Sequence, residues 1–191
     1  MQEVGVLAWV LPSLADLDGH FPGGPHRFTT ARHTLYLLYV LEHIDLPEFQ
    51  RSVKQDRQGD LARVKSLIDR YMNTDNSKFR LILRLAILLH DAHKEEGYER
   101  FDVPHPFGGA NELVPQAVAR LRTASNFRSE IGWLVWYHQE LTTRAGKIRG
   151  LSFHQALLDL LDSGGEKLDA DLWDLFYLQE LYQSLIYTPF S

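Results

Sequence analysis

The sequence contains no cysteine in 191 residues. This absence excludes disulfide bonds, thiolate metal sites and cysteine nucleophiles, and it is typical of cytoplasmic proteins. No apolar run reaches the length of a membrane-spanning helix, and the N-terminus lacks the basic segment before an apolar stretch that marks a signal peptide. We therefore expect a cytoplasmic protein with no membrane segment.

Patterns typical of strands and of phosphate-binding loops are also missing. We find no convincing alternation of apolar and polar residues, no hairpin signal, no internal repeat and no glycine-rich phosphate loop. The net charge of −5 argues against broad nucleic-acid binding. The hydrophobic fraction of 45% is that of an ordinary globular protein. We expect an all-α fold of seven or eight helices in one domain over residues 1–191.

The most strongly patterned stretch covers residues 79–94, with the sequence FRLILRLAILLHDAHK. Its apolar residues recur at helical spacing, and Ser77 stands where a helix N-cap belongs. The apolar run ends in His90 and Asp91, with Lys94 close behind. Charge at the edge of a core costs free energy unless it is paired or binds a metal. The pair could supply N and O ligands to Mn, Fe, Ni, Zn or Mg, or it could form a polar turn at the end of the helix.

Helical spacing and capping residues predict further helices on both sides of this stretch. They cover residues 4–14, 29–44, 61–71, 112–122, 127–141, 153–161 and 169–187. On the second of these, His33 lies one turn before Leu37, so its side chain is expected to point inward. The charged segment 47–60 is expected to be a solvated helix turn or loop. The segment 95–110, rich in proline and glycine, is expected to be irregular.

Aromatic residues concentrate near the C-terminus, and the sequence allows two interpretations of them. They are Trp173, Phe176, Tyr177, Tyr182, Tyr187 and Phe190. They could belong to the core, or they could form the surface of a homo-oligomer.

The order of the metal-binding residue types resembles that of a known family. His33, the doublet His90–Asp91 and a carboxylate late in the chain are similar to the H…HD…D pattern of the HD metal-dependent phosphohydrolase superfamily. Lys94 matches the lysine of HDxxK, although His93 replaces the glycine or alanine of many members. The segments VGVLAWVLPSL, HRFTTARHTL, LRLAILLHDAHK, HPFGGA and IGWLVWYHQEL resemble the HD domains of PII uridylyl-removing enzymes and CCA-adding tRNA nucleotidyltransferases.

This resemblance implies an HD-domain helical bundle that binds one divalent metal ion or two. The first ion would be bound by His33, His90, Asp91 and a carboxylate of the final helix. The family has aspartate there, whereas this chain has Glu180; Asp159 and Asp162 are the alternatives. His105 and His138 are placed where dinuclear relatives have extra histidines, so they would help to bind a second ion.

The resemblance also implies the chemistry. The metal would polarise a phosphoryl oxygen, Asp91 would also take a proton from the attacking water, and Lys94 would balance the phosphate charge. The basic residues of the following segment could bind the rest of an anionic substrate, or they could simply belong to a solvated loop. They are Arg144, Lys147 and Arg149. The expected substrate is a small phosphomonoester or phosphodiester, nucleotide-related, or a nucleotidylylated protein.

The departure at Glu180 supports a second hypothesis, a degenerate HD domain that binds a nucleotide or a partner protein without catalysis. Metal binding separates the two hypotheses. If the catalytic one holds, alanine at His90 or Asp91 is expected to abolish metal binding and to leave the helical fold mostly intact.

Overall fold

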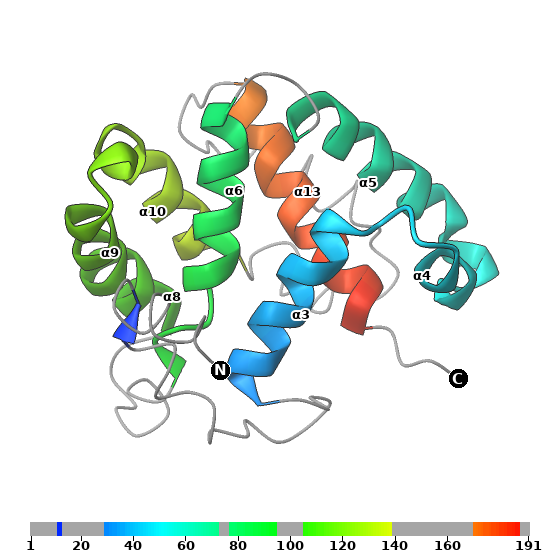
Figure 1. Cartoon of the computed structure of the whole chain (residues 1–191), viewed down its shortest axis with the longest axis horizontal. Helices are drawn as coiled ribbons and strands as arrows, with labels where there is room; N and C mark the ends of the chain where they lie inside the picture. The colour runs from blue at the N-terminus through cyan, green and yellow to red at the C-terminus, as the bar shows by residue number, and fades with distance from the viewer. Residues whose placement is uncertain (1–10, 13–28, 73–76, 95–104, 139–169, 188–191) are drawn as a thin grey trace. The chain divides into compact units, whose positions relative to one another are not determined.

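The computed structural model describes residues 11–12, 29–72, 77–94, 105–138 and 170–187 (Figure 1). In these ranges the regular elements are helices and there is no strand, so the predicted all-α class is confirmed. The chain divides into two compact units: residues 1–43 with 80–136, and residues 44–79 with 137–191. The single domain over residues 1–191 stays a prediction.

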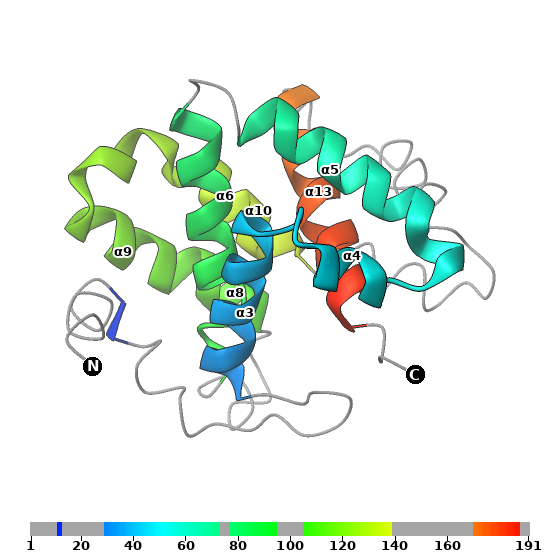
Figure 2. The same cartoon turned by 45° about the vertical axis from the view of Figure 1, so that its right-hand side comes forward.

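The first unit holds the His90–Asp91 doublet. Its elements are α3 (Thr30–Glu42), most of α6 (Ser77–Leu89), α8 (His105–Gly108), the π-helical stretch η3 (Gly109–Leu113), α9 (Val114–Arg120), the 3-10 helix η4 (Arg122–Phe127) and α10 (Arg128–Tyr137). The chain reverses between α9 and α10 through η4, as Figures 1 and 2 show.

Helix α3 begins where the sequence predicts. The Thr29 side chain accepts the backbone N–H of Arg32 at 3.4 Å, and the Thr29 carbonyl accepts that of His33 at 2.8 Å. The first bond satisfies an N–H group that the first helical turn would otherwise leave unpaired, and the second is the first regular hydrogen bond of the helix. His33, Leu37 and Leu41 follow at four-residue spacing and are all buried. The prediction that His33 points inward is therefore confirmed.

Helix α6 buries a wide apolar face and ends at Leu89, directly before the doublet. Among its fully buried side chains are Ile82, Leu83 and Ile87. Burying a side chain of this size stabilises the fold by about 1.5–3 kcal/mol. After Leu89 the backbone tightens into a turn, in which the Ala92 N–H donates to the Leu89 carbonyl at 3.2 Å. The doublet therefore lies on the turn that directly follows the buried apolar face of this helix.

The second unit holds α4 (Pro47–Ser52), the 3-10 helix η2 (Gln55–Arg57), α5 (Gln58–Tyr71) and α13 (Ala170–Tyr187). Helices α5 and α13 pack side by side (Figures 1 and 2). The Tyr71 hydroxyl lies 2.8 Å from a carboxylate oxygen of Asp171 and 2.6 Å from one of Asp174, and Arg70 also bonds to Asp174. Burial and these hydrogen bonds raise the pKa of Tyr71, so the phenol stays protonated.

Most of the described C-terminal aromatic residues belong to the core. Phe176 and Tyr182 are fully buried on α13, and Tyr177 is nearly so. Trp173 is half-buried and packs edge-on against Phe176. A helix that is apolar all round is typical of a protein interior. These residues favour the core interpretation for α13, while the homo-oligomer stays a prediction.

Two segments differ from the expectation. Residues 47–60 form α4, η2 and the start of α5, because Pro47 suits the first helical position and Phe49 is buried. Residues 105–110, expected to be irregular, belong to α8 and η3. The helix predicted over residues 153–161, and nearly all of that over 4–14, lie outside the described residues.

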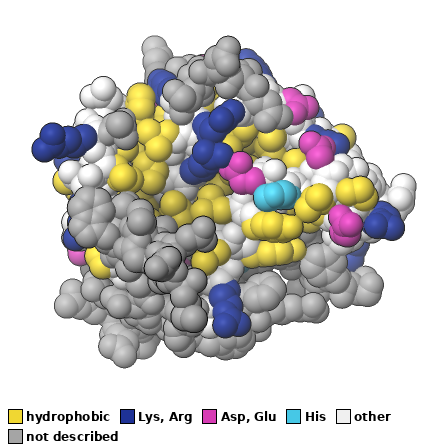
Figure 3. Space-filling model, viewed as in Figure 1, with side chains coloured by type: hydrophobic (Ala, Val, Ile, Leu, Met, Phe, Trp, Pro, Cys, Tyr) yellow, Lys and Arg dark blue, Asp and Glu magenta, His cyan; other side chains and the backbone are white. Residues whose placement is uncertain are grey.

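The described surface carries interspersed charges. Figure 3 shows Lys, Arg, Asp and Glu side chains among hydrophobic ones on the face seen in Figure 1. Among the helices that the structure describes, none is both long enough and apolar enough to cross a membrane.

Candidate metal centre

Three buried side chains of the first unit form a group that could hold a metal ion. His33 comes from α3, and His90 and Asp91 come from the turn after α6. One ligand atom from each lies within 4.8 Å of the others. The two imidazole rings meet edge-on with centroids 5.7 Å apart, and His90 Nε2 lies 3.3 Å from Asp91 Oδ2. Residues 57 positions apart in the sequence thus supply two nitrogens and one oxygen to one point.

The His90 ring is oriented by the backbone. Its Nδ1 lies 2.6 Å from the Ile87 carbonyl oxygen, which can only accept a hydrogen bond. Nδ1 therefore carries the proton and donates it, so in the neutral ring Nε2 keeps its lone pair. That lone pair is on the side of Asp91. Metal-ligating histidines are commonly fixed by such a bond from the other ring nitrogen.

Lys94 is buried beside the group and pairs with Asp91. Its ammonium donates to Asp91 Oδ2 at 2.6 Å, and both side chains are almost fully buried. The spacing of three residues brings the two groups together at the end of α6, where the Lys94 N–H also donates to the Asp91 carbonyl at 3.1 Å. Lys94 therefore compensates the carboxylate charge. Its role toward a substrate phosphate stays a prediction.

The donor set fits a divalent ion. Two imidazoles and one carboxylate are ligands that Mn, Fe, Ni and Zn accept, and three protein ligands leave coordination positions for water or substrate. The Nε2–Oδ2 distance and the tautomer of His90 both favour a cation between these atoms. The prediction of a metal-binding group is supported for these three residues, whereas the identity and number of the ions stay predictions.

A buried contact of His93, two residues after Asp91, depends on a glycine. The His93 ring is buried and lies directly against the backbone of Gly108 in α8, at a place where a β-carbon would overlap the ring. His93 Nε2 is also 3.7 Å from a carboxylate oxygen of Glu112. Gly109 is also closely packed, although less tightly, because its β-carbon would meet Val135 at 3.0 Å and the Leu89 carbonyl oxygen at 3.5 Å. The two glycines let α8 and η3 approach the turn that carries the doublet.

We expect Gly108→Ala to lower the free energy of unfolding by about 1–3 kcal/mol, because the new methyl group must displace a buried ring. Urea denaturation measures this change. Truncating His93 as well should remove most of the effect, since the obstructing ring is then gone.

The matched control for this substitution is Gly59→Ala on α5. A β-carbon there would meet no atom within 4 Å, so alanine should be neutral or should stabilise the helix by up to about 1 kcal/mol. Equal effects of the two substitutions would contradict the close contact between Gly108 and His93.

The other predicted site residues fall elsewhere or outside the described part. Glu180 is fully buried on α13, and His138 is buried directly after α10; both belong to the second unit. Their places in the metal site stay predictions. His105 begins α8, but its side chain lies outside the described residues. Wholly outside them are Arg144, Lys147, Arg149, Asp159 and Asp162.

Sequence reasoning missed two contacts of the centre. The pairing of Lys94 with Asp91 was signalled by their spacing of three residues, which brings side chains together at a helix end. The contact between His93 and Gly108 had a weaker signal: adjacent glycines often mark a close approach of backbone and side chain.

No protein-family model, no curated protein and no solved structure matches this chain. The resemblance to the HD superfamily therefore rests on the residues quoted above and on the group that they form.

Proposed function

We propose that this protein is a metal-dependent phosphohydrolase of the HD type. The observation that carries the proposal is the buried group His33, His90 and Asp91, which could hold a divalent ion. These are the residues that the H…HD part of the sequence pattern selects. Their convergence from α3 and from the end of α6 supports that pattern over a simple polar helix end.

The chain's own residues have separate tasks in this proposal. His33 and His90 present imidazole nitrogens, and the Ile87 carbonyl holds the His90 ring in place. Asp91 presents a carboxylate that can bind the ion and take a proton from the attacking water. Lys94 brings a positive charge to the same carboxylate and, in the proposal, to the substrate phosphate. When bound, the divalent ion supplies Lewis acidity toward a phosphoryl oxygen and lowers the pKa of water.

The substrate class is a phosphomonoester or a phosphodiester, and a nucleotide-related one is favoured by the segments that resemble HD domains. A nucleotidylylated protein belongs to the same class, since the bond to be broken is also a phosphate ester. The last metal ligand would be Glu180. Its side chain is one methylene longer than that of the aspartate that the family has at this position.

A direct test is hydrolysis of para-nitrophenyl phosphate and its bis-ester by the full chain. We expect release of nitrophenol with Mn²⁺ and none with EDTA, and we expect His90→Ala to lower kcat at least about 100-fold because a metal ligand is lost. The control is His43→Ala, which removes an exposed histidine from the end of α3. Equal activity of His90→Ala and the wild type would refute the assignment.

One observation favours the second hypothesis, a degenerate HD domain that binds a nucleotide or a partner without catalysis. Asp91 already has a buried cationic partner in Lys94, so the carboxylate is compensated without a metal ion. In that case the protein would bind no Mn²⁺, and the hydrolysis assay would give no activity with any metal.

A further inference from the structure

Two buried hydroxyl groups lie at the start of α3, the helix that carries His33. Thr30 is the first residue of the helix and Thr34 follows one turn later; the two residues are 1% and 0% exposed. Among the described residues, neither hydroxyl has a hydrogen-bond partner. A buried polar group without a partner costs free energy, and folded proteins contain few of them. The two hydroxyls therefore point to a ligand that satisfies them.

Thr34 has a local alternative that it does not use. A threonine inside a helix often donates to the carbonyl oxygen four residues earlier, which here belongs to Thr30. Within the helix as described, Thr34 forms no such bond. Helical side chains lean toward the N-terminus of their helix, so the Thr34 side chain is directed over the turn that Thr30 begins. Residues four apart share a helix face, and both hydroxyls are thus available on one side of the first turn.

The backbone of the same turn adds two donors. The N–H of Arg32 is bonded to the Thr29 side chain, and that of His33 to the Thr29 carbonyl. In the part of the chain that the structure describes, no acceptor is found for the N–H groups of Thr30 and Ala31, and Ala31 is buried as well. The N-terminal end of a helix carries a partial positive charge, and N–H groups that are unpaired there bind anions.

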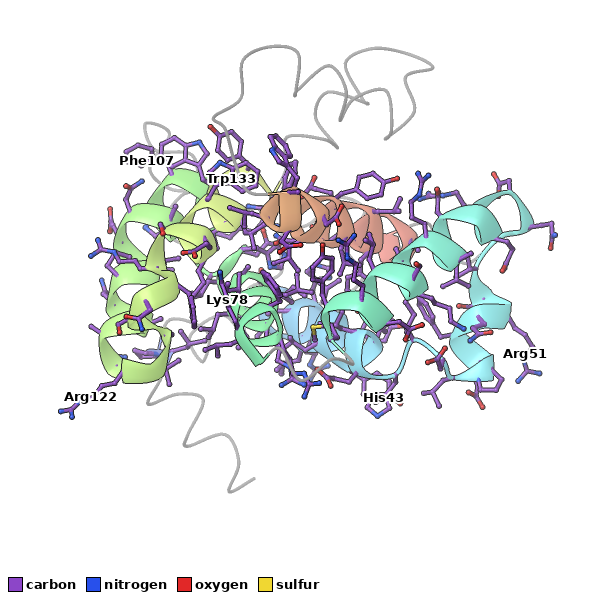
Figure 4. The ribbon with its side chains drawn as sticks, turned by 90° about the horizontal axis from the view of Figure 1, so that it is seen from above. His43, Arg51, Lys78, Phe107, Arg122 and Trp133 are labelled. Atoms are coloured by element: carbon purple, nitrogen blue, oxygen red, sulfur yellow. The ribbon has the colours of Figure 1, made fainter. Side chains whose placement is uncertain are left out.

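The opposite end of α3 is different. His43, the C-cap residue, is exposed, and Figure 4 shows its ring pointing away from the ribbon. Its Nδ1 lies 2.8 Å from the Tyr39 carbonyl oxygen, and its backbone N–H donates to the Val40 carbonyl at 3.0 Å. At that end the polar groups of His43 therefore have partners in the helix itself, whereas the buried end keeps donors without acceptors among the described residues.

We propose that the N-terminal turn of α3 binds a phosphate oxyanion, with the hydroxyls of Thr30 and Thr34 and the N–H groups of Thr30 and Ala31 as donors. The oxygens of such an anion only accept hydrogen bonds, so they suit these donors better than a water molecule, which must also donate. Thr30 lies three residues before His33, and β-carbons at this spacing on a helix are about 5–6 Å apart. The anion would therefore lie beside the metal-binding group.

This inference deepens the proposed function and rests on it for the role of the anion, which would be the phosphoryl group of the substrate. Helix α3 would then hold the phosphoryl group at its first turn and, through His33, contribute a ligand to the ion. The carboxylate of the metal-binding group does not oppose this, because Asp91 is paired with the Lys94 ammonium at 2.6 Å and its negative charge is compensated. Binding of the anion itself does not require catalysis.

The experiment is a calorimetric titration of inorganic phosphate into the full chain, once with Mn²⁺ and once with EDTA. Thr30→Val and Thr34→Val keep the side-chain volume and remove the hydroxyl. Each should weaken phosphate binding about tenfold, because a hydrogen bond to a charged group is lost. Thr30→Ser and Thr34→Ser keep the hydroxyl and remove only a methyl group, so they should bind phosphate as the wild type does.

Stability and metal affinity separate a role in binding from a role in packing. The valine variants remove a buried hydroxyl that has no partner among the described residues, so their urea midpoints should equal or exceed that of the wild type. The serine variants leave a small cavity and should unfold at lower urea. Mn²⁺ affinity should be unchanged in all four variants. If valine disturbs the helical circular dichroism, alanine serves in its place.

The inference is overturned if the wild type binds no phosphate under either condition. It is also overturned if the valine variants bind phosphate as tightly as the wild type, since the hydroxyls would then be buried for packing alone. Phosphate binding that the valine variants lose, in a chain that binds no Mn²⁺, supports the anion site and refutes the proposed function. Mn²⁺-dependent hydrolysis with the same kcat/KM in the wild type and the valine variants refutes the anion site alone.

Discussion

Replacing Asp91 with alanine is expected to lower the free energy of unfolding by about 3–5 kcal/mol, because it leaves a buried ammonium without its partner. Lys94 Nζ lies 2.6 Å from Asp91 Oδ2, and both side chains are almost fully buried. Urea denaturation of the wild type and the variant measures the loss. The sequence suggested that this variant would leave the fold mostly intact; the buried pair revises that expectation for Asp91.

A second substitution tests the cause of the effect. Lys94→Met in the Asp91→Ala background removes the unpaired charge and keeps the length of the side chain, so it should restore a large part of the lost stability. If the double variant is as unstable as Asp91→Ala alone, the loss comes from packing rather than from the unpaired charge.

The matched control is an ion pair at the surface of the same unit. Arg84 of α6 bonds to Glu42 of α3 at 2.7 Å, and both side chains are about 40% exposed. Exposed pairs contribute about 0–1 kcal/mol, because water screens the charges and holding two long side chains costs entropy. Glu42→Ala should therefore have a small effect. If Glu42→Ala lowered the free energy of unfolding as much as Asp91→Ala, burial would not be the reason for the large effect at Asp91.

The long apolar helices could be predicted from the sequence because local signals agree with tertiary packing. Thr29 has a capping side chain and starts α3, and the apolar residues of α6 and α13 recur over many turns. The inward position of His33 followed from its spacing to Leu37. These residues also locate the metal centre, since the doublet ends the most strongly patterned stretch of the chain.

The short helical elements could not be predicted from the sequence, because in these segments tertiary packing overrides the local conformational preference of the residues. Gly108 and Gly109 weaken a helix in isolation, yet here they are helical, since their missing β-carbons allow contact with His93 and Val135. The charges of segment 47–60 suggested a solvated helix turn or loop, whereas α4 is anchored by the buried Phe49. Hydrophobic periodicity cannot predict contacts between individual side chains, such as that of Phe107 with Trp136.

His33→Ala and His90→Ala are each expected to lower Mn²⁺ affinity by more than about 100-fold. Each removes one of the three ligand atoms that converge within 4.8 Å, and even the loss of a residue that only supports a ligand costs about 10–100-fold. Calorimetric titration of Mn²⁺ into the full chain measures the affinity. Both histidines are buried, so circular dichroism must show that each variant keeps its helices; His33→Asn and His90→Asn serve as polar replacements if alanine does not.

The control is His43→Ala, which removes a histidine from the C-cap of the helix that carries His33. His43 is exposed and its Nδ1 bonds to the Tyr39 carbonyl at 2.8 Å, so it offers nothing to the centre. Its Mn²⁺ affinity should equal that of the wild type. Affinity that survives in both ligand variants would mean that His33 and His90 converge for packing alone, because neither lone pair would then contribute to binding. Affinity lost in both but kept in His43→Ala would show that α3 and the turn after α6 together hold the ion.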